Sequence, residues 1–418
     1  MASPDIVYVG SFRFPDGDAG ATRVRGMGKA LREAGFDVLF AGVEKRGRPE
    51  DLQPDGRFCY DGFSYVPEQD LSNTRLSRLK RAWLTHLSGS TTMRRLRSMD
   101  LTRTRAVIAY EPFLLLLWRL QRFCRRRGID LIVDCTEWYD PWHRLGGLLG
   151  WESELRNRWL QPKVGRLIAI SSFLARYYRA RGCSVLRVPP LIDMDERSRY
   201  PATPPAREDG ALRLVYAGMP AKKDLLANAL LGLRDLRASD LPVVLDLVGP
   251  SRQSLAACVR GGSRLLDRLG SALVCHGHLP HQVALGLVAG ADFSILLRPD
   301  KRYAHAGFPT KLVESLSLGV PIISNPTSDI AEYVRDGQEG VLLEDSTPEA
   351  FVAGVKRLLQ MPKEQRHAMR ASARKRARDC FDYRRYVEPL REFVEQVSCR
   401  LSVAGERGRK DQSCRREK

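Results

Sequence analysis

Residues 306–321, which read AGFPTKLVESLSLGVP, contain both the start and the end of one short helix. Pro309 suits the first turn of a helix, and Gly319 with the proline two positions later supplies an abrupt stop. Apolar runs with the composition of buried strands flank this helix at 293–297 and 320–324. The stretch therefore predicts a strand–helix–strand unit, the building block of a parallel sheet.

The same alternation of short apolar runs and longer helical patterns extends through nearly the whole chain. We expect a first sheet from the runs at 6–9, 38–41, 63–66, 106–110, 131–133, 167–170 and 185–188. We expect a second sheet from the runs at 212–217, 243–248, 273–275, 293–297, 320–324 and 341–343. The predicted fold class is α/β, with two doubly wound Rossmann-like domains whose sheets are mainly parallel.

The domain boundaries follow from changes in composition. Residues 200–210, YPATPPAREDG, interrupt any regular element and predict a linker between a first domain at 1–199 and a second at 211–382. A helix at 383–398 is expected to return to the first domain. The basic tail at 399–418 has little apolar content, so we expect it to be disordered.

Composition limits the class of protein. A chain of 418 residues that is 43% hydrophobic can fill two cores, and its nine scattered cysteines without a C-x-x-C pair predict reduced thiols in a cytosol. The first residues lack a basic leader, so no secretory signal is expected. The longest apolar run, 113–118, is far shorter than the roughly 20 residues of a membrane-spanning helix. We therefore predict a cytoplasmic protein, either soluble or peripherally attached, whose net charge of +19 favours an anionic partner.

The strongest candidate for binding an anion is the start of the helix in 306–321. Free backbone N–H groups and the positive end of the helix dipole favour a diphosphate, and Lys311 adds a full charge. Glu314, on the same face, suits the hydroxyl groups of a ribose. The alternative is an i,i+3 ion pair between Lys311 and Glu314 on an exposed helix. The predicted contacts also include the preceding loop and first turn, namely Gly307, Phe308, Pro309 and Thr310.

Two further segments supply candidate phosphate contacts. Gly218 ends the strand at 212–217 and permits close backbone approach, and the basic pair Lys222 and Lys223 follows it. A lysine pair on a surface turn is the ordinary alternative. Arg298 ends the strand at 293–297, where the ligand crevice of a doubly wound sheet is expected.

The first half offers candidate residues for a second substrate. Gly17, Gly20 and Arg23 follow the opening strand, in a loop that matches neither a P-loop nor G-x-G-x-x-G, so no nicotinamide cofactor is predicted. Glu137 and Asp140 follow another strand among aromatic residues, a combination that suits a sugar. They would otherwise cap the next helix.

Three histidines and a cysteine lie within residues 275–281, CHGHLPH, and suggest a metal site. Neighbouring residues at the end of a strand point to opposite faces, and no distant Cys pair or carboxylate completes a tetrahedral set. We therefore predict no metal here.

Residues 76–87, LSRLKRAWLTHL, place apolar side chains on one helical stripe surrounded by basic ones. Such a helix can lie on an anionic membrane surface. Packing of the same stripe into a core explains the pattern equally well.

The second half as a whole resembles the retaining GT-B glycosyltransferases of family 4, the glycosyl transferases group 1. The likeness rests on segments in a fixed order, namely 216–224, the Gly277 loop, 291–298, 307–314, 319–321 and 336–340. In the first half, 168–171 and 190–193 look like the closing strands of the family's first domain. The resemblance implies two parallel sheets facing an interdomain cleft, and a nucleotide diphosphate sugar as donor.

The resemblance also implies the roles of individual residues. Lys311 with Lys222 or Lys223 would hold the donor diphosphate, and Glu314 would hold the ribose. Catalysis would be positioning and electrostatic stabilisation of the leaving group, with Lys311, Glu314 and Lys223 as its main groups. It implies transfer with retention and no protein nucleophile, metal or other cofactor. Two features depart from the family pattern: Ala306 replaces the first acid of E-x-x-x-x-x-x-x-E, and 134–140 lacks a histidine.

By family habit, the acceptor would be a saccharide or a lipid-linked molecule in cell-surface polysaccharide or glycolipid assembly, at the inner face of the plasma membrane. A hexosyltransferase with an anionic membrane surface as partner, and without a nucleic acid, is the leading hypothesis. Three alternatives stay open: a degenerate GT-B binding protein, a GT-B nucleotide-sugar epimerase, and a basic nucleic-acid-binding protein.

Overall fold

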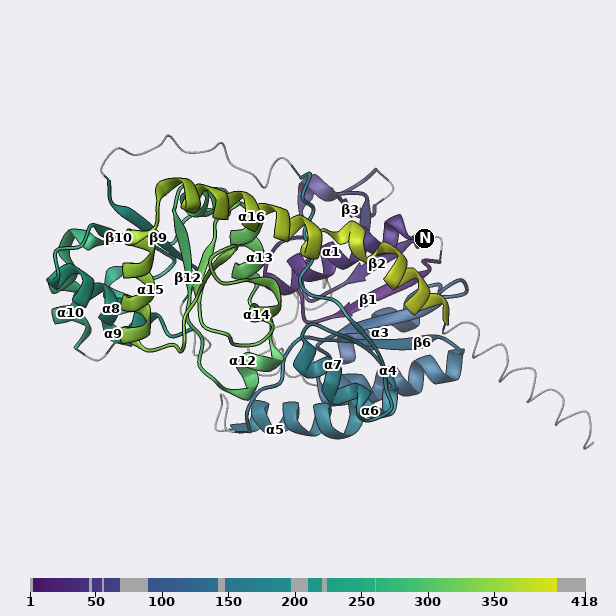
Figure 1. The fold of residues 1–418 in the computed structure, drawn as a ribbon. Helices are drawn as coiled ribbons and strands as arrows, with labels where there is room; N and C mark the ends of the chain where they lie inside the picture. Colours follow the sequence, from purple (N-terminus) through teal and green to yellow (C-terminus); the bar gives the residue numbers. More distant parts are fainter. Residues whose placement is uncertain are drawn as a thin grey trace, which may run out of the picture. The chain divides into compact units, whose positions relative to one another are not determined.

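The computed structural model describes residues 3–44, 47–54, 56–67, 89–141, 147–196, 210–219, 224–259 and 261–396. The chain divides into two compact units, one ending at Leu191 and resuming at Tyr383, the other running from Ile192 to Asp382 (Figure 1). The second unit begins earlier than the predicted boundary at 199, because the Ile192 backbone N–H donates to the Phe381 carbonyl at 2.9 Å. Most of the predicted linker, 200–209, and the tail at 399–418 lie outside the described residues.

The first unit is built on an eight-stranded sheet with the order β3-β4-β2-β1-β5-β6-β7-β8. Neighbouring strands pair in parallel, except that β3 and β4 form an antiparallel pair at one edge. The strands are β1 (Ile6–Gly10), β2 (Val38–Ala41), β3 (Phe58–Tyr60), β4 (Phe63–Tyr65), β5 (Ala106–Tyr110), β6 (Asp130–Cys135), β7 (Arg166–Ala169) and β8 (Ser184–Arg187). Only β3 was not expected from the sequence.

Helices connect these strands and cover the sheet. They are α1 (Ala19–Glu33), α3 (Ser90–Ser98), α4 (Leu114–Arg127), α5 (Leu148–Leu155), α6 (Gln161–Val164) and α7 (Ser172–Arg179), with the π-helix η5 (Arg156–Leu160), the short turns η1 (Pro49–Asp51) and η8 (Tyr383–Tyr386), and a last helix at 387–396. Asp18 caps α1 by accepting from the Ala21 backbone N–H at 2.8 Å. The last helix buries Leu390, Phe393 and Val394 in the core of this unit.

The second unit contains a six-stranded parallel sheet with the order β11-β10-β9-β12-β13-β14. Its strands are β9 (Leu212–Ala217), β10 (Val243–Val248), β11 (Leu273–Gly277), β12 (Phe293–Leu296), β13 (Ile322–Ser324) and β14 (Gly340–Leu342). After β9 the chain adds β10 and β11 on one side, and then places β12 on the other side of β9. The order of strands therefore reverses between β9 and β12.

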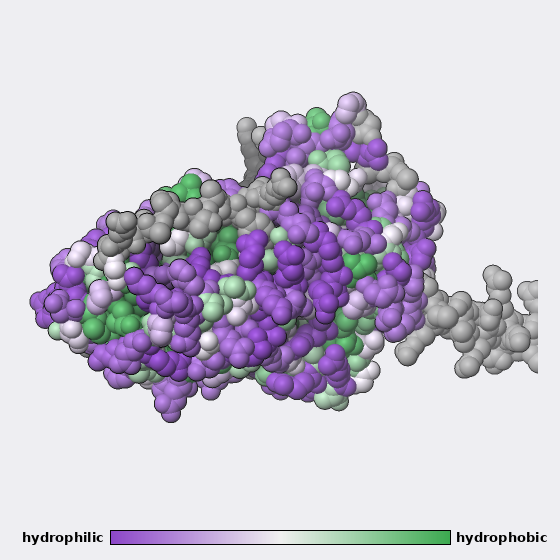
Figure 2. Space-filling model, turned by 45° about the horizontal axis from the view of Figure 1, so that its top comes forward, coloured by the Kyte–Doolittle hydropathy of each residue, from purple (hydrophilic) through white to green (hydrophobic). Residues whose placement is uncertain are grey.

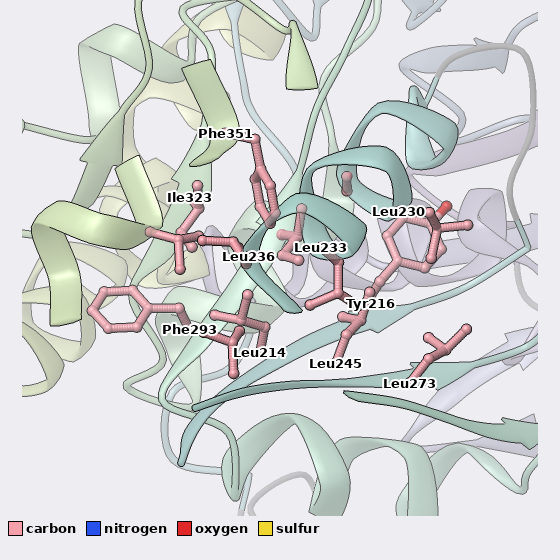
Figure 3. Packing of buried hydrophobic residues seen from close by; sticks show 14 of the residues in the cluster. Leu214, Tyr216, Leu230, Leu233, Leu236, Leu245, Leu273, Phe293, Ile323 and Phe351 are labelled. Atoms are coloured by element: carbon pink, nitrogen blue, oxygen red, sulfur yellow. The ribbon is translucent and has the colours of Figure 1, made fainter. Parts of the chain in front are cut away.

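The helices of this unit are α8 (Leu226–Ala238), α9 (Arg252–Cys258), α10 (Gly262–Leu269), η7 (Gly270–Ala272), α11 (His281–Ala289), α12 (Arg302–Ala306), α13 (Thr310–Ser317), α14 (Ile330–Tyr333), α15 (Pro348–Gln360) and α16 (Lys363–Phe381). Leu230, Leu233 and Leu236 repeat at helical spacing, so one face of α8 is buried against the sheet. Figure 3 shows these leucines gathered with Leu214 and Phe293 of the strands.

The predicted fold class, two doubly wound α/β domains with mainly parallel sheets, is confirmed. The face of the molecule shown in Figure 2 is largely hydrophilic, with small scattered apolar patches. Among the residues that the structure describes, no helix is both long and apolar enough to cross a membrane.

Candidate functional site

Loops of the second unit leave the carboxyl ends of neighbouring strands where the strand order reverses. Gly218 follows β9, Gly249 follows β10, and Arg298 lies just beyond β12. Doubly wound folds bind their ligands outside the carboxyl ends of the strands at such a point. The candidate site is therefore at the ends of β9 and β12.

Two glycines give this edge of the sheet a closely packed backbone. Gly218 has φ +129° and Gly249 has φ +123°, conformations that a side chain would strain. A Cβ atom on Gly249 would lie 2.6 Å from the Gly218 carbonyl oxygen. The Gly249 backbone N–H donates to the carbonyl of Gly277 at 2.8 Å. Sequence reasoning missed Gly249, whose signal was a glycine directly after the apolar run 243–248.

Lys311 reaches this edge from the first turn of α13. Its Nζ lies 2.5 Å from Asp224 Oδ2 and donates to the Tyr216 hydroxyl at 2.7 Å. It also sits 4.0 Å from the centroid of the Tyr216 ring. A Cβ atom at position 218 would lie 2.7 Å from Lys311 Cε, so the space for the lysine depends on Gly218 being a glycine.

The surroundings of Lys311 disfavour its charge. Burial lowers the pKa of Lys311, and the nearby carboxylate of Asp224 opposes that shift. The i,i+3 ion pair proposed as an alternative does not describe this structure: among the described residues, the ion pair of Lys311 is with Asp224, and none joins it to Glu314. Asp224 was not a predicted site residue, because it lies 87 positions from its partner.

Arg298 is buried beside the same edge, with 3% of its surface exposed. Asn325 fixes its backbone, accepting from the Arg298 N–H at 2.9 Å and donating to the Arg298 carbonyl at 2.9 Å. Besides burial, which acts most strongly, the positive charge of Arg298 lowers the pKa of Lys311. Two cations therefore lie close enough to interact, which favours an anionic ligand.

The loop before α13 is fixed by contacts with later segments of the second unit. Ser328 donates to the Gly307 carbonyl at 2.7 Å, and the buried Phe308 contacts the rings of Tyr333 and Phe381. The helix then begins, with Pro309 at its N-cap position.

The side chains around this helix start differ in exposure. Thr310 and Glu314 are partly exposed on α13. Ala306, at the position of the missing family acid, is fully buried on α12. Lys222 and Lys223 lie outside the described residues.

In the first unit, Arg23 is buried in an ion pair. Its Nη2 lies 2.6 Å from Asp134 Oδ1, and its Nη1 donates to the Val188 carbonyl at 3.1 Å. Tyr8 donates to the other oxygen of Asp134 at 2.6 Å. Arg23 therefore joins α1 to the ends of β6 and β8 within the interior of this unit.

The other predicted acceptor-side residues lie in two loops. Gly20 is buried in the first turn of α1, and Gly17 is exposed in the loop before it. Glu137 and Asp140 are partly exposed after β6. The N-cap residue of α5 is Gly147, so neither carboxylate caps that helix.

Glu111 organises the loop after β6, a role that sequence reasoning missed. It has φ +40°, which is unusual for a residue with a side chain. Its carboxylate accepts from the backbone N–H groups of Thr136 and Glu137 and from Arg156 Nη1, the last at 2.7 Å. The only sequence signal was an acidic residue directly after the strand at 106–110.

Several carboxylates with metal-like spacing have other partners. The triplet 16–18, DGD, has D-x-D spacing, but Asp18 caps α1 and Asp16 pairs with Arg48. In the 275–281 segment, His276 Nε2 lies 2.7 Å from Asp246 Oδ1. No group of three or more potential ligands occurs within the described part of the chain.

Comparison with solved structures places the fold. The structure is similar to sucrose-phosphate synthase from Thermosynechococcus elongatus, with a TM-score of 0.68 at 14% identity over 94% of this chain and 99% of that one. It is also similar to Anabaena HepE in complex with UDP, with a TM-score of 0.62 at 12% identity over 96% of this chain and 100% of that one. The chain therefore has the GT-B fold.

Comparison with family models then gives the family. The model described as glycosyl transferases group 1 matches residues 276–376, and that of the glycosyl transferase 4-like domain matches residues 19–191. With both units matched, the chain belongs to the group 1 glycosyl transferases of the GT-B class.

Curated relatives match a smaller part of the chain. D-inositol 3-phosphate glycosyltransferase of Streptomyces griseus is 28% identical over 216 residues, which is 45% of this chain and 44% of that protein. The chain spans about two fifths of the length of the curated relatives it matches.

Proposed function

We propose that this protein is a glycosyltransferase that moves a hexosyl group from a nucleotide diphosphate sugar to an acceptor hydroxyl with retention of configuration. The observation that carries the proposal is Lys311, held at the start of α13 against Gly218 at the end of β9. Family membership supports it, as does the structural neighbour HepE, which has been solved with UDP and with UDP-glucose.

In this proposal the carboxylate of Asp224 interacts with Lys311 in the free protein, where the negative charge of the ligand would otherwise lie. Donor diphosphate takes over the interaction with Lys311 that Asp224 makes in the free protein. Arg298 and the free N–H groups of the α13 N-terminus add positive potential, and Lys222 or Lys223 supplies a further cation. Glu314, one turn into the same helix, accepts hydrogen bonds from the ribose hydroxyls.

The same positive charges serve the chemistry. They stabilise the departing diphosphate, which develops negative charge as the bond to the sugar breaks. A phosphate oxygen of the leaving group takes the proton of the acceptor hydroxyl, so no protein nucleophile and no metal take part. Acceptor binding falls to the loops of the first unit that contain Gly17, Gly20, Glu137 and Asp140, while the buried Arg23 supports those loops.

We place the reaction in cell-surface polysaccharide or glycolipid assembly, with a saccharide or lipid-linked acceptor. The protein then acts in the cytoplasm as a peripheral protein at the inner face of the membrane. The net charge of +19 supports this setting, because such acceptors are presented at an anionic surface.

The experiment is a calorimetric titration with UDP, GDP, ADP and CDP. One nucleotide class should bind, and Lys311→Ala should weaken it by about tenfold or more, the usual cost of a charge-assisted hydrogen bond. Glu314→Ala should remove the preference for that nucleotide over its 2′-deoxy form. Lys375→Ala, an exposed lysine on α16, serves as the matched control and should bind normally. Absence of binding by all four nucleotides to the folded protein contradicts the proposal.

A second candidate, a non-catalytic GT-B binding protein, is favoured by one observation. Ala306 is fully buried where the family has an acidic residue, so that position offers no carboxylate to a sugar. The two candidates differ in turnover. Release of the nucleotide from its sugar across a panel of acceptors supports the transferase, and the anomeric configuration of the product, read by NMR, tests retention. Tight binding without turnover supports the binding protein.

A further inference from the structure

One surface of the first unit exposes large apolar side chains. Trp118 on α4 is 45% exposed, and on the following segment Leu155 and Trp159 are 46% and 67% exposed. Figure 1 shows α4, α5 and α6 together at one margin of this unit, and α4 contacts both α5 and η5. Clustered exposed apolar residues of this size mark an interaction surface more often than single ones do.

These side chains line one shallow cavity of about 360 Å³. Apart from Lys163, the lining is apolar: Leu114, Leu115 and Trp118 of α4, Leu155 of α5, and Trp159 and Leu160 of η5. Trp151, one helical turn before Leu155, is also half-exposed. Trp118 and Trp159 therefore line one apolar cavity, and Trp151 is exposed on the helix that carries Leu155.

Arginines of α4 adjoin the apolar surface at Trp118. The helix α4 contains five arginines and no acidic residue. Arg122 stacks over the Trp118 ring at 5.0 Å, and Arg127 stacks over the Phe123 ring at 4.9 Å. Arg119, Arg122 and Arg126 also line a second hollow that adjoins Trp118.

The acidic residues of the neighbouring segment do not offset these charges. Glu152 accepts from the Leu114 backbone N–H at 2.7 Å and pairs with Arg156 at 3.3 Å. Glu154 accepts from the Trp138 indole at 2.7 Å. Both carboxylates are largely buried, with side-chain exposures of 15% and 9%. The surface is therefore apolar and basic.

We propose that this surface, formed by α4, α5 and η5, docks on an anionic lipid bilayer. Tryptophan rings favour the headgroup level of a membrane because they combine an apolar body with a polar N–H. Arginine side chains around them match the negative charge of the lipid headgroups. The proposal concerns lipid binding alone and does not depend on sugar transfer, since the nucleotide contacts lie in the other unit.

The test is co-sedimentation of the full chain with phosphatidylcholine vesicles, with and without phosphatidylglycerol. Binding should require phosphatidylglycerol. Arg122→Glu with Arg126→Glu should weaken it by about 25-fold or more, because each basic residue near such a surface contributes about fivefold. Trp118→Ser with Trp159→Ser should weaken it by about tenfold.

Two controls match these variants. Arg264→Glu with Arg268→Glu makes the same charge change at exposed positions of α10 in the other unit. Leu52→Ser removes an apolar side chain that is 51% exposed elsewhere in the first unit. Both controls should bind vesicles like the wild type, and all variants should keep native circular dichroism and nucleotide affinity. Loss of vesicle binding with intact nucleotide binding separates this proposal from the proposed function.

Hydrogen exchange then locates the contact. Vesicles should protect backbone amides in 114–127 and 151–160. Protection confined to the predicted amphipathic helix at 76–87, which lies outside the described residues, would overturn the proposal. Equal binding to neutral vesicles would do the same. Binding of duplex DNA, together with vesicle binding that the tryptophan substitutions leave unchanged, would also overturn the proposal, because a general polyanion site behaves in this way.

Discussion

At the scale of single residues, Asp224 gives the most direct test of the proposed donor site. Asp224→Asn removes the carboxylate that neutralises Lys311. We expect the free energy of unfolding to fall by about 2 kcal/mol, because a partly buried charge loses its partner. We expect nucleotide affinity to rise by about tenfold, because the diphosphate no longer competes with Asp224. Thermal unfolding and calorimetry measure the two effects.

Asp267→Asn, at an exposed position of α10, is the matched control and should change neither quantity. Weaker binding by Asp224→Asn would instead show that Asp224 positions Lys311 for the ligand. The pH dependence gives a further check. Burial lowers the pKa of Lys311 below its ordinary value of 10.5, so the lysine loses its charge earlier as pH rises. Nucleotide affinity should therefore decline at a lower pH than an exposed lysine would give.

A substitution at Gly218 tests whether nucleotide binding requires the space beside this glycine that Lys311 occupies. Gly218→Ala introduces a Cβ atom 2.7 Å from Lys311 Cε at a φ of +129°. Gly337→Ala is the matched control, because Gly337 also has a positive φ, +75°, but open space around its Cβ position. Both should lose about 1 kcal/mol or more of stability from backbone strain. Only Gly218→Ala should weaken nucleotide binding. Equal nucleotide affinities of the two variants in calorimetry would contradict the placement of the nucleotide site beside Gly218.

At the scale of elements, β6 begins with Asp130, a carboxyl group whose ionisation is disfavoured by burial in the folded protein. Burial raises the pKa of Asp130 from 3.8 to about 6, although Arg166 opposes the shift. The folded chain therefore holds this proton more tightly than the unfolded chain. Below about pH 4 the Asp130 carboxyl group is protonated in both states and leaves the free energy of unfolding unchanged. As the pH rises from about 4 through about 6, its ionisation lowers the free energy of unfolding.

Asp130→Asn should accordingly stabilise the protein by about 1 kcal/mol above pH 6, a value reduced for the half-exposed position of the group. The gain should disappear toward about pH 4. Urea unfolding at several pH values measures it. A gain that is the same at every pH would show that the charge of Asp130 is not the cause.

At the scale of the whole molecule, the two units can be observed separately. All six tryptophans precede residue 192 and so belong to the first unit, whereas the candidate nucleotide contacts belong to the second. A nucleotide at about 100 times its Kd should add about 2.7 kcal/mol to the second unit and raise its Tm by about 5–10 °C.

This rise should appear in unfolding followed by circular dichroism but not in unfolding followed by tryptophan fluorescence. An equal rise in both signals would mean that the nucleotide stabilises the first unit as well.

The sequence by itself determined most of the secondary structure and the fold class. The runs at 106–110, 212–217 and 243–248 have the same bounds as β5, β9 and β10. These strands were predictable because each is a short, largely buried run of mainly apolar residues that include Val, which is local information. The strand β3 was missed because it has only three residues, all half-buried, and lies at the edge of the sheet beside β4. The glycine loop, Lys311 and the helix start were also visible locally.

Only the tertiary structure decided which side chains meet. Lys311 pairs with Asp224 across 87 positions, and Arg23 pairs with Asp134 across 111. Nothing near either residue in the sequence indicates its partner, because the partner depends on the order of strands in the sheet. Placing β9 between β10 and β12 brings the end of β9 to the start of α13, which turns a lysine and a glycine from distant segments into one candidate site.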